Sequence, residues 1–435
     1  MNRKILSLAL PSIITNITVP LLGMVDTAIV GHINTNGSTL DYIGGIAIGS
    51  MIFNFIYWNF GFLRLGTSGF TAQAYGGRNF QEAVNILIRA SFIAISVALL
   101  LIIFQVPISL LTKYFIEDKQ GVWALAMQYF FIRIWASPAT LLMYALKGWF
   151  IGFQDAKSPM WISILINILN ILFSLIFVFV YDMGIRGVAL GTVIAQYGGL
   201  ALTIGIWFAK YSKLKKYISI KSALKLREMK LFFKVNSDIF IRTFLLVIVT
   251  TYFTVASSHF EYPILAVNTL LMQLFTIFSY FLDGFAYSAE GLVGRYYGAK
   301  NMENLRKAIR HILLWGLGIS LSFVLIYALF SNQILGILTN KLDVLEAAKP
   351  FLYWTLLIPI TGFIAFLYDG ILIGMTASNI MRNVMIISSV LFFLSYFLLK
   401  DTYHNSALWF SFILYLSSRS ILSWYFSKKL IYKTN

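Results

Sequence analysis

The sequence lacks cysteine altogether and is poor in charge. Its 435 residues include no Cys, 8 Pro and only 17 acids, and charged residues make up 12% of the chain. Soluble globular proteins contain about 25% charged residues. The absence of cysteine excludes disulfides and thiolate metal sites, and the low charge excludes an ordinary soluble enzyme or a disordered chain. No G-x-x-x-x-G-K-S or G-x-x-x-x-G-K-T motif is present, which excludes an ATPase within the chain.

Apolar residues dominate what is present, at 59% of the chain. A membrane-spanning helix needs about 20 consecutive apolar residues. We therefore predict an all-α polytopic membrane protein with twelve transmembrane helices. The predicted spans are 5–31, 42–74, 83–106, 121–146, 159–181, 185–209, 231–257, 263–294, 307–330, 350–373, 379–399 and 405–427.

The net charge of +17 follows the loops between these spans. Every second connection is basic, with Lys147 and Lys157 in one such loop and Lys300 in another, whereas the alternate loops are sparse or mixed. Cytoplasmic loops are enriched in Lys and Arg, so the pattern predicts that both termini are cytoplasmic. It argues against nucleic-acid binding, because the basic residues form no soluble domain.

One long basic connection divides the chain. Residues 210–234 contain nine Lys or Arg and a single acid, Glu228. We predict an amino-terminal lobe over 1–209, a cytoplasmic linker over 210–230 and a carboxy-terminal lobe over 231–435. The linker is a topological anchor or a surface that binds anionic lipid, and positive-inside bias alone is enough to predict the first.

The two predicted lobes contain an internal repeat. At an offset of 222 residues, the segments 66–85 and 288–307 align Tyr75-Gly76 with Tyr297-Gly298 and Asn79 with Asn301. Six spans per copy give both copies the same orientation, related by a pseudo-twofold axis along the membrane normal. We expect such lobes to enclose a central cleft, an arrangement typical of transporters.

Four acids fall inside predicted spans: Asp26, Asp283, Glu290 and Asp369. Because a charge in a membrane is costly, each is a candidate functional residue, and the alternative is a structural ion pair between helices. Arg64, Arg133, Arg242 and Arg419 also fall within spans. Asp238 and Arg242 lie four residues apart, a spacing that predicts mutual neutralisation. Arg64 and Arg133 have no partner nearby in sequence, so we expect snorkelling or pairing with an acid on another helix.

Asp26 is the strongest candidate for ion coupling. Pro11 and Pro20 each remove a backbone hydrogen bond from its helix, so this helix can bend. Desolvation favours the neutral form of a carboxyl, so a buried Asp26 can take up and release a proton. On the fifth span, Asn167, Asn170 and Ser174 share one stripe; they support Asp26 or join helices.

Several segments together resemble the multidrug and toxic-compound extrusion (MATE) family, most closely its DinF-like branch. They are PLLGMVDTAIVGH at 20–32, NFGFLRLGTSGFTAQAYGGRN at 59–79, GWFIGFQDAKSP at 148–159, FLDGFAYSAEGLVGRYYGAKN at 281–301 and FLYDGILIGMTASNIMRN at 366–383. The resemblance implies export driven by a proton or sodium gradient across a bacterial inner membrane.

The same resemblance implies roles for individual residues. Asp26 falls on the coupling acid of the first helix, and Pro11 on the proline where that helix bends. Asn170 and Thr192 match polar partners of the acid. Ser174 departs from the family, which often has an acid there, and this weakens a two-carboxylate relay and a sodium site.

Our main hypothesis is a cation-coupled antiporter, proton-driven rather than sodium-driven, that exports amphipathic and often cationic compounds. We expect no enzyme activity, no cofactor and no bound metal, since the four histidines lack metal-ligand spacing. We expect a monomer whose partners are small organic substrates and membrane lipid. The alternatives are a flippase for lipid-linked oligosaccharides, which requires Arg64 and Arg133 in the cleft, and a non-transporting scaffold, in which Asp26 is dispensable.

Overall fold

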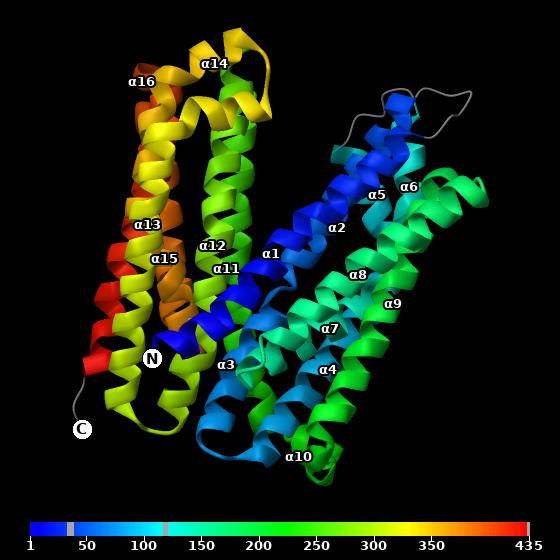
Figure 1. Cartoon of the computed structure of the whole chain (residues 1–435), viewed down its shortest axis with the longest axis vertical. Coiled ribbons are helices and arrows are strands. Elements are labelled where there is room, and N and C mark those ends of the chain that lie inside the picture. The colour runs from blue at the N-terminus through cyan, green and yellow to red at the C-terminus, as the bar shows by residue number, and fades with distance from the viewer. Residues whose placement is uncertain (33–38, 116–120, 433–435) are drawn as a thin grey trace. The chain divides into compact units, whose positions relative to one another are not determined.

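The fold is built from helices throughout the part of the chain that is described. The structure is a computed structural model that describes residues 1–32, 39–115 and 121–432, and none of these residues is in a β-strand. Figure 1 shows the helices in chain order. Their packing divides the chain into two compact units, which we call the N-unit (Ile14–Phe232) and the C-unit (Met1–Ile13 with Phe233–Asn435).

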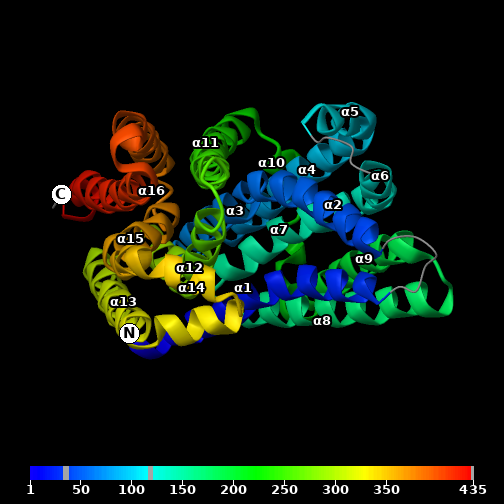
Figure 2. The same cartoon turned by 90° about the horizontal axis from the view of Figure 1, so that it is seen from above.

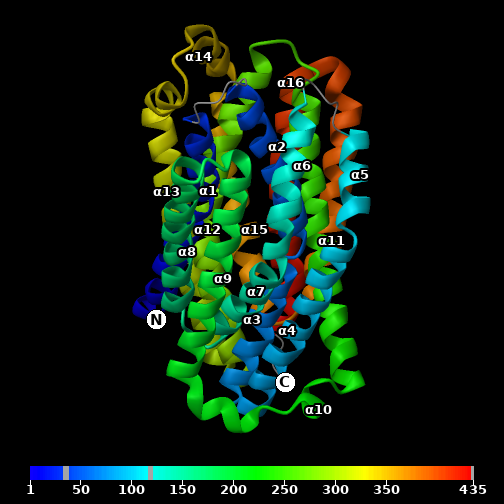
Figure 3. The ribbon, with the colours of Figure 1, turned by 90° about the vertical axis from the view of Figure 1, so that its right-hand side faces the viewer.

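Helix α1 (Asn2–Gly31) contributes residues to both units. The other elements of the N-unit are α2 (Thr39–Asn59), α3 (Phe62–Gly76), α4 (Phe80–Ile103), α5 (Gln105–Phe115), α6 (Val122–Arg133), η1 (Ile134–Ala136), α7 (Ser137–Gly152), α8 (Lys157–Leu175), the π-helical turn η2 (Ile176–Val180), α9 (Gly184–Tyr211), η3 (Ser212–Tyr217) and α10 (Ile220–Ala223). Helices α8 and α9 pack side by side along their lengths (Figure 3).

The C-unit contains the longer helices. They are α11 (Leu226–Ser257), which begins just inside the N-unit, α12 (Ile264–Gly298), α13 (Met302–Leu338), α14 (Leu342–Ala348), η4 (Lys349–Phe351), α15 (Leu352–Gly374) and α16 (Ser378–Tyr432). Helix α15 packs against α12, α13 and α16 and so lies at the centre of this unit (Figure 2).

Eleven helical segments among the described residues are long and apolar enough to span a membrane. The last one, α16, has 55 residues and breaks at His404, whose φ of 45° and ψ of −120° are not helical. It therefore holds two predicted spans, 379–399 and 405–427. The prediction of an all-α protein with twelve transmembrane helices is confirmed.

The repeat at an offset of 222 residues extends through the backbone of both units. Arg78 and Lys300 have positive φ angles of 55° and 54°, and each ends the turn that follows a Tyr-Gly pair. Asn79 and Asn301 then cap the next helix by accepting a hydrogen bond from the backbone N–H three residues on, at 3.0 Å in both copies. Asp182 and His404, at the same offset, also share a positive φ, so the break in α16 repeats the connection before α9.

Close helix packing repeats with the same offset. A Cβ added to Gly148 of α7 would lie 2.3 Å from the carbonyl oxygen of Arg64, and one added to Gly370 of α15 would lie 2.2 Å from that of Ala286. Four residues later, Gly152 and Gly374 meet the carbonyl oxygens of Ser68 and Glu290 in the same manner. Glycine lets two backbones approach closely in a membrane, which explains these pairs.

The two chain termini and the α12–α13 connection lie at one end of the C-unit, and α14 lies at the other end (Figure 1). The predicted linker, 210–230, contains η3, α10 and the first residues of α11. It lies within the N-unit.

Candidate ion-coupling site

Asp26 lies on α1 and is buried in the N-unit. The residue is 2% exposed, and Asp26 is the only fully buried acid among the described residues of the N-unit. One carboxyl oxygen, Oδ1, has no hydrogen-bond partner within the described part of the chain. An unpartnered carboxyl oxygen in an apolar surrounding is costly, so it marks a place where a proton or a donor group can bind.

Asn170 and Thr192 lie beside this carboxyl. The Asn170 amide on α8 is within hydrogen-bonding reach of Asp26 and donates from Nδ2 to Thr192 Oγ1 on α9 at 2.9 Å. The Thr192 hydroxyl donates in turn to the carbonyl of Val188 at 3.0 Å. Asn170 Oδ1 has no partner among the described residues, so the amide retains an acceptor that a protonated Asp26 can use.

Arg133 completes the group from α6. Its guanidinium interacts electrostatically with Asp26, donates to the Tyr129 hydroxyl at 2.5 Å and lies 4.8 Å from the ring centroid of Phe53. Phe53 and Tyr129 are both fully buried. The sequence analysis did not identify Arg133 as a neighbour of Asp26. The spacing of Tyr129 and Arg133, four residues apart on one helix face, was the signal available for their contact.

The other two residues of the predicted polar stripe lie differently. Asn167 donates from Nδ2 to the backbone carbonyl of Thr18 at 2.9 Å, and so joins α8 to α1. Ser174 is fully buried, and its hydroxyl has no partner among the described residues. A Cβ added to Gly191 would lie 2.6 Å from Ser174 Oγ, so α9 packs tightly against this position.

Helix α1 remains helical across both of its prolines. Pro11 is buried and belongs to the part of α1 that lies in the C-unit, whereas Pro20 is exposed and belongs to the N-unit part. Each proline leaves a carbonyl one turn earlier without its helical partner, which weakens the helix at two places. The helix that carries Asp26 thus joins the two units through a segment that is easy to bend.

Asp369 of the C-unit lies in an ion-pair cluster. It pairs with Arg242 of α11 and accepts from Arg419 of α16 at 2.8 Å. Both arginines are at least 85% buried in their side chains, and Arg419 also lies 5.2 Å from the ring of Tyr415. Of the two alternatives for this acid, the ion pair is the one present.

The predicted neutralisation of Arg242 by Asp238 is wrong. Asp238 accepts instead from Arg382 at 2.6 Å and from the Ser378 hydroxyl at 2.8 Å, both on α16. Both charges are therefore neutralised by partners on other helices. Asp238 of α11 pairs with Arg382 of α16, and Arg242 of α11 pairs with Asp369 of α15.

Asp283 and Glu290 both lie on α12. Asp283 is half-buried and within electrostatic reach of Arg419, whereas Glu290 is 1% exposed. These positions put Asp283 close to the Asp369 cluster. Their role as a cation site or as ion-pair partners stays a prediction.

One basic residue of α7 differs from expectation, and a second basic residue lies close to it. Lys147 was predicted to lie in a loop, but it is helical, half-buried and donates to Ser163 Oγ of α8 at 2.9 Å. Arg64 of α3 is half-buried and interacts electrostatically with Lys147. The long alkyl chain of Lys147 packs between helices, and its amine donates to the Ser163 hydroxyl. A lysine can therefore lie within a helix here rather than in a loop.

These features define the class of the protein: a polytopic helical membrane protein built from two repeated units. Solved structures with this fold support that assignment. A crystal structure of MATE in the bent conformation superposes with a TM-score of 0.87 at 19% identity, over 99% of this chain and 95% of that one. A transporter of the MOP superfamily from Pyrococcus furiosus, described as having reverse polarity of its binding pocket, gives a TM-score of 0.85 at 17% identity, over 98% and 95%.

The chain belongs to the MatE family, whose model matches residues 11–176 and 239–398. It is 33% identical over 422 residues to the DNA damage-inducible protein F of Escherichia coli, covering 97% of this chain and 90% of that protein. It is 21% identical over 355 residues to the probable multidrug resistance protein NorM of Thermotoga maritima, covering 80% and 74%. The resemblance to the MATE family is confirmed, and the protein is a transporter rather than an enzyme.

Proposed function

We propose that the protein is an antiporter that exports amphipathic, often cationic organic compounds in exchange for protons. The observation that carries this proposal is the Asp26 carboxyl, which is buried beside Arg133 and has one oxygen without a partner. Such a group gains or loses one proton with little rearrangement. We infer that it lies in a bacterial inner membrane, with both termini cytoplasmic.

The net charge of the Asp26–Arg133 pair changes when Asp26 binds a proton, and this change links proton binding to substrate release. With Asp26 ionised the pair is neutral, and an organic cation can bind nearby. With Asp26 protonated the pair carries one positive charge, and a cation in the same low-dielectric surrounding is repelled. Proton and substrate therefore bind with opposite preference, which is the coupling that antiport requires.

Protonation also changes the hydrogen bonds of α1. A neutral Asp26 can donate to Asn170 Oδ1, which has no partner among the described residues. We propose that this new bond, together with the weakened segments at Pro11 and Pro20, favours a different bend of α1. The bend is the step that links proton binding to alternating access.

The substrate class follows from the rings near the pair. Phe53 and Tyr129 already hold a guanidinium against their faces, at 4.8 and 5.2 Å from the ring centroids. Aromatic faces accept organic cations in the same way. We expect no cofactor and a monomer that acts on substrates reaching it from the cytoplasm or the membrane.

A second candidate is a flippase for lipid-linked oligosaccharides, whose substrates are anionic. The observation that favours it is Arg133 itself, a half-buried cation within the proposed site. The Asp26 carboxyl opposes it, because an anionic substrate is repelled by an ionised acid.

Inverted membrane vesicles distinguish these functions. We expect ethidium to accumulate in vesicles with an acidic lumen and no sodium gradient, and not in vesicles with only a sodium gradient. Accumulation driven by sodium at equal pH would contradict proton coupling. Failure of both gradients, with transfer of a fluorescent polyprenyl-diphosphate sugar across the bilayer, would favour the flippase.

A further inference from the structure

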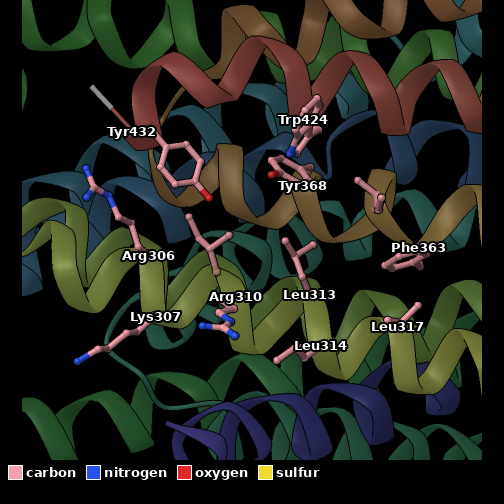
Figure 4. Close-up of a pocket in the computed structure, with 12 residues that line it drawn as sticks. Arg306, Lys307, Arg310, Leu313, Leu314, Leu317, Phe363, Tyr368, Trp424 and Tyr432 are labelled. Atoms are coloured by element: carbon pink, nitrogen blue, oxygen red, sulfur yellow. The ribbon is translucent and has the colours of Figure 1, made fainter. Parts of the chain in front are cut away.

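A groove of about 580 Å³ lies on the C-unit between α13, α15 and α16. Figure 4 shows its two ends. Arg306, Lys307 and Arg310 lie toward one end, together with Tyr432, and the apolar side chains of Leu317 and Phe363 lie toward the other. The residues that line the groove include no acid. The groove thus combines a basic end with a long apolar surface.

The basic end is partly fixed by the carboxy-terminal turn of α16. Arg306 donates from Nε to the carbonyl of Ile431 at 3.1 Å, and its guanidinium lies 5.7 Å from the ring of Tyr432. Arg310 is exposed one turn further along α13. Lys307 shares an exposed ion pair with Glu303 at 2.6 Å, so it is the least available of the three.

The internal repeat supplies a comparison for this groove. A second groove, of about 400 Å³, lies on the N-unit against α4. Its residues Val84, Ile88 and Ile95 stand 222 positions before Arg306, Arg310 and Leu317, and its Leu146 stands 222 before Tyr368. The two grooves are therefore the same place in two copies of one fold, apolar in one copy and basic at one end in the other.

The groove on the N-unit is lined in part by the segment around α10. Ile218, Ile220 and Leu224, from the segment around α10, line it. Polar bonds to α4 hold that segment down, since Arg89 Nε donates to the carbonyl of Ala223 at 2.6 Å and Gln81 donates to that of Tyr217, also at 2.6 Å. The matching positions on α13 are His311, whose Nδ1 lies 2.7 Å from the carbonyl oxygen of Lys307, and Glu303, which pairs with Lys307.

We propose that an anionic phospholipid occupies the groove on the C-unit. Its phosphate binds Arg306 and Arg310, and one acyl chain lies along Leu313, Leu317 and Phe363. Charge complementarity selects the headgroup, because basic side chains stand here where the repeat has Val84 and Ile88. The basic end lies at the same end of the unit as both termini, the end we predict to be cytoplasmic, where anionic headgroups are available. This site is separate from Asp26 and goes beyond the proposed transport function.

Native mass spectrometry of the full chain in detergent, titrated with single lipids, tests the proposal. We expect the wild-type protein to bind phosphatidylglycerol more tightly than phosphatidylcholine. The double variant Arg306→Ala/Arg310→Ala should bind phosphatidylglycerol at least about fivefold more weakly than the wild type, because each basic residue near an anionic headgroup contributes to the binding free energy. Leu317→Trp, which fills the apolar part without changing charge, should also weaken it.

A matched control removes the same charge elsewhere. Lys341→Ala/Lys349→Ala deletes two exposed basic residues beside α14, at the other end of the C-unit, and should leave phosphatidylglycerol affinity unchanged. Equal affinity for the two lipids, or equal losses in the two double variants, would overturn the proposal. Competition by glycerol phosphate at the concentrations at which phosphatidylglycerol binds would overturn it as well, since it would show that the apolar groove adds nothing. A monodisperse elution profile for each variant establishes that it is folded.

Discussion

Asp26 and Asp369 are both acids within membrane helices, yet their neighbours give them different roles. Asp369 is placed between Arg242 and Arg419 and forms an ion pair with each of them. Asp26 has a single basic neighbour and an oxygen with no partner in the described part of the chain. A carboxyl that two cations stabilise is a poor proton carrier, whereas one held by a single cation and an amide can change state.

Replacing Asp369 should therefore affect stability more than coupling. Asp369→Asn leaves two buried arginines without a counter-charge, and we expect a loss of about 3 kcal/mol in the free energy of unfolding. Arg242→Met added to this variant should restore part of the loss. Thermal unfolding in detergent measures both effects. Export per folded molecule should remain driven by protons, and a sodium-dependent export that disappears in Asp369→Asn would place coupling in the C-unit instead.

Asp155, between α7 and α8, should give the protein an acid-sensitive connection. Its carboxyl accepts from Ser158 Oγ at 2.6 Å, Lys210 Nζ at 3.0 Å and Tyr211 Oη at 3.2 Å. Burial alone would raise the pKa of Asp155, but the hydrogen bonds from Ser158 and the hydrogen bond and charge of Lys210 outweigh it and lower the pKa below the ordinary value of 3.8.

Because the folded-state pKa is depressed, the stabilisation by Asp155 is present at neutral pH and is lost as pH falls through that lowered value. Asp155→Asn should thus unfold at a lower temperature than wild type at pH 7, and the difference should shrink below about pH 4. Thermal midpoints measured from pH 3 to 7 check this. A difference that is constant across that range would show that the charge of Asp155 is irrelevant.

At the scale of elements, the paired glycines determine how close the helices approach. Gly148→Ala and Gly370→Ala should each destabilise the protein by about 1–3 kcal/mol, because the new methyl group meets a backbone carbonyl that cannot move away. Gly318→Ala is the matched control, since nothing lies within 4 Å of its added Cβ. Unfolding in detergent should show similar losses for the first two and none for the third. A loss in only one of the two glycine variants would mean that the repeated close contacts do not contribute equally to the free energy of unfolding.

The helices were predictable from sequence, but many of their contacts were not. Apolar length gave the twelve spans, and one Tyr-Gly turn gave the offset of the repeat. The partner of Asp238 was missed because spacing rules compare residues on the same helix, whereas Arg382 lies 144 positions away. Arg133 was left unassigned beside Asp26 for the same reason. Lys147 was misplaced because a Lys in a membrane protein suggests a loop, and only the fold reveals Ser163 as its partner.

At the scale of the whole molecule, orientation is the first property to test. The chain lacks cysteine, so a single cysteine at Lys216 or Lys341 reports the side of the membrane on which each residue lies. We expect an impermeant maleimide added to intact cells to label the cysteine at 341 and not the one at 216. Labelling of 216 from outside would invert the predicted topology.

The central claim, that Asp26 couples export to protons, is tested most directly by Asp26→Asn in proteoliposomes. Asparagine keeps the shape but fixes the neutral state, so export cannot be driven by a pH gradient. We predict that the variant reaches the membrane at wild-type levels, binds ethidium more weakly than the wild type because Arg133 is left without a counter-charge, and shows no ethidium-dependent proton movement across the vesicle membrane. Proton movement and export at the wild-type rate, at matched protein density, would contradict the account.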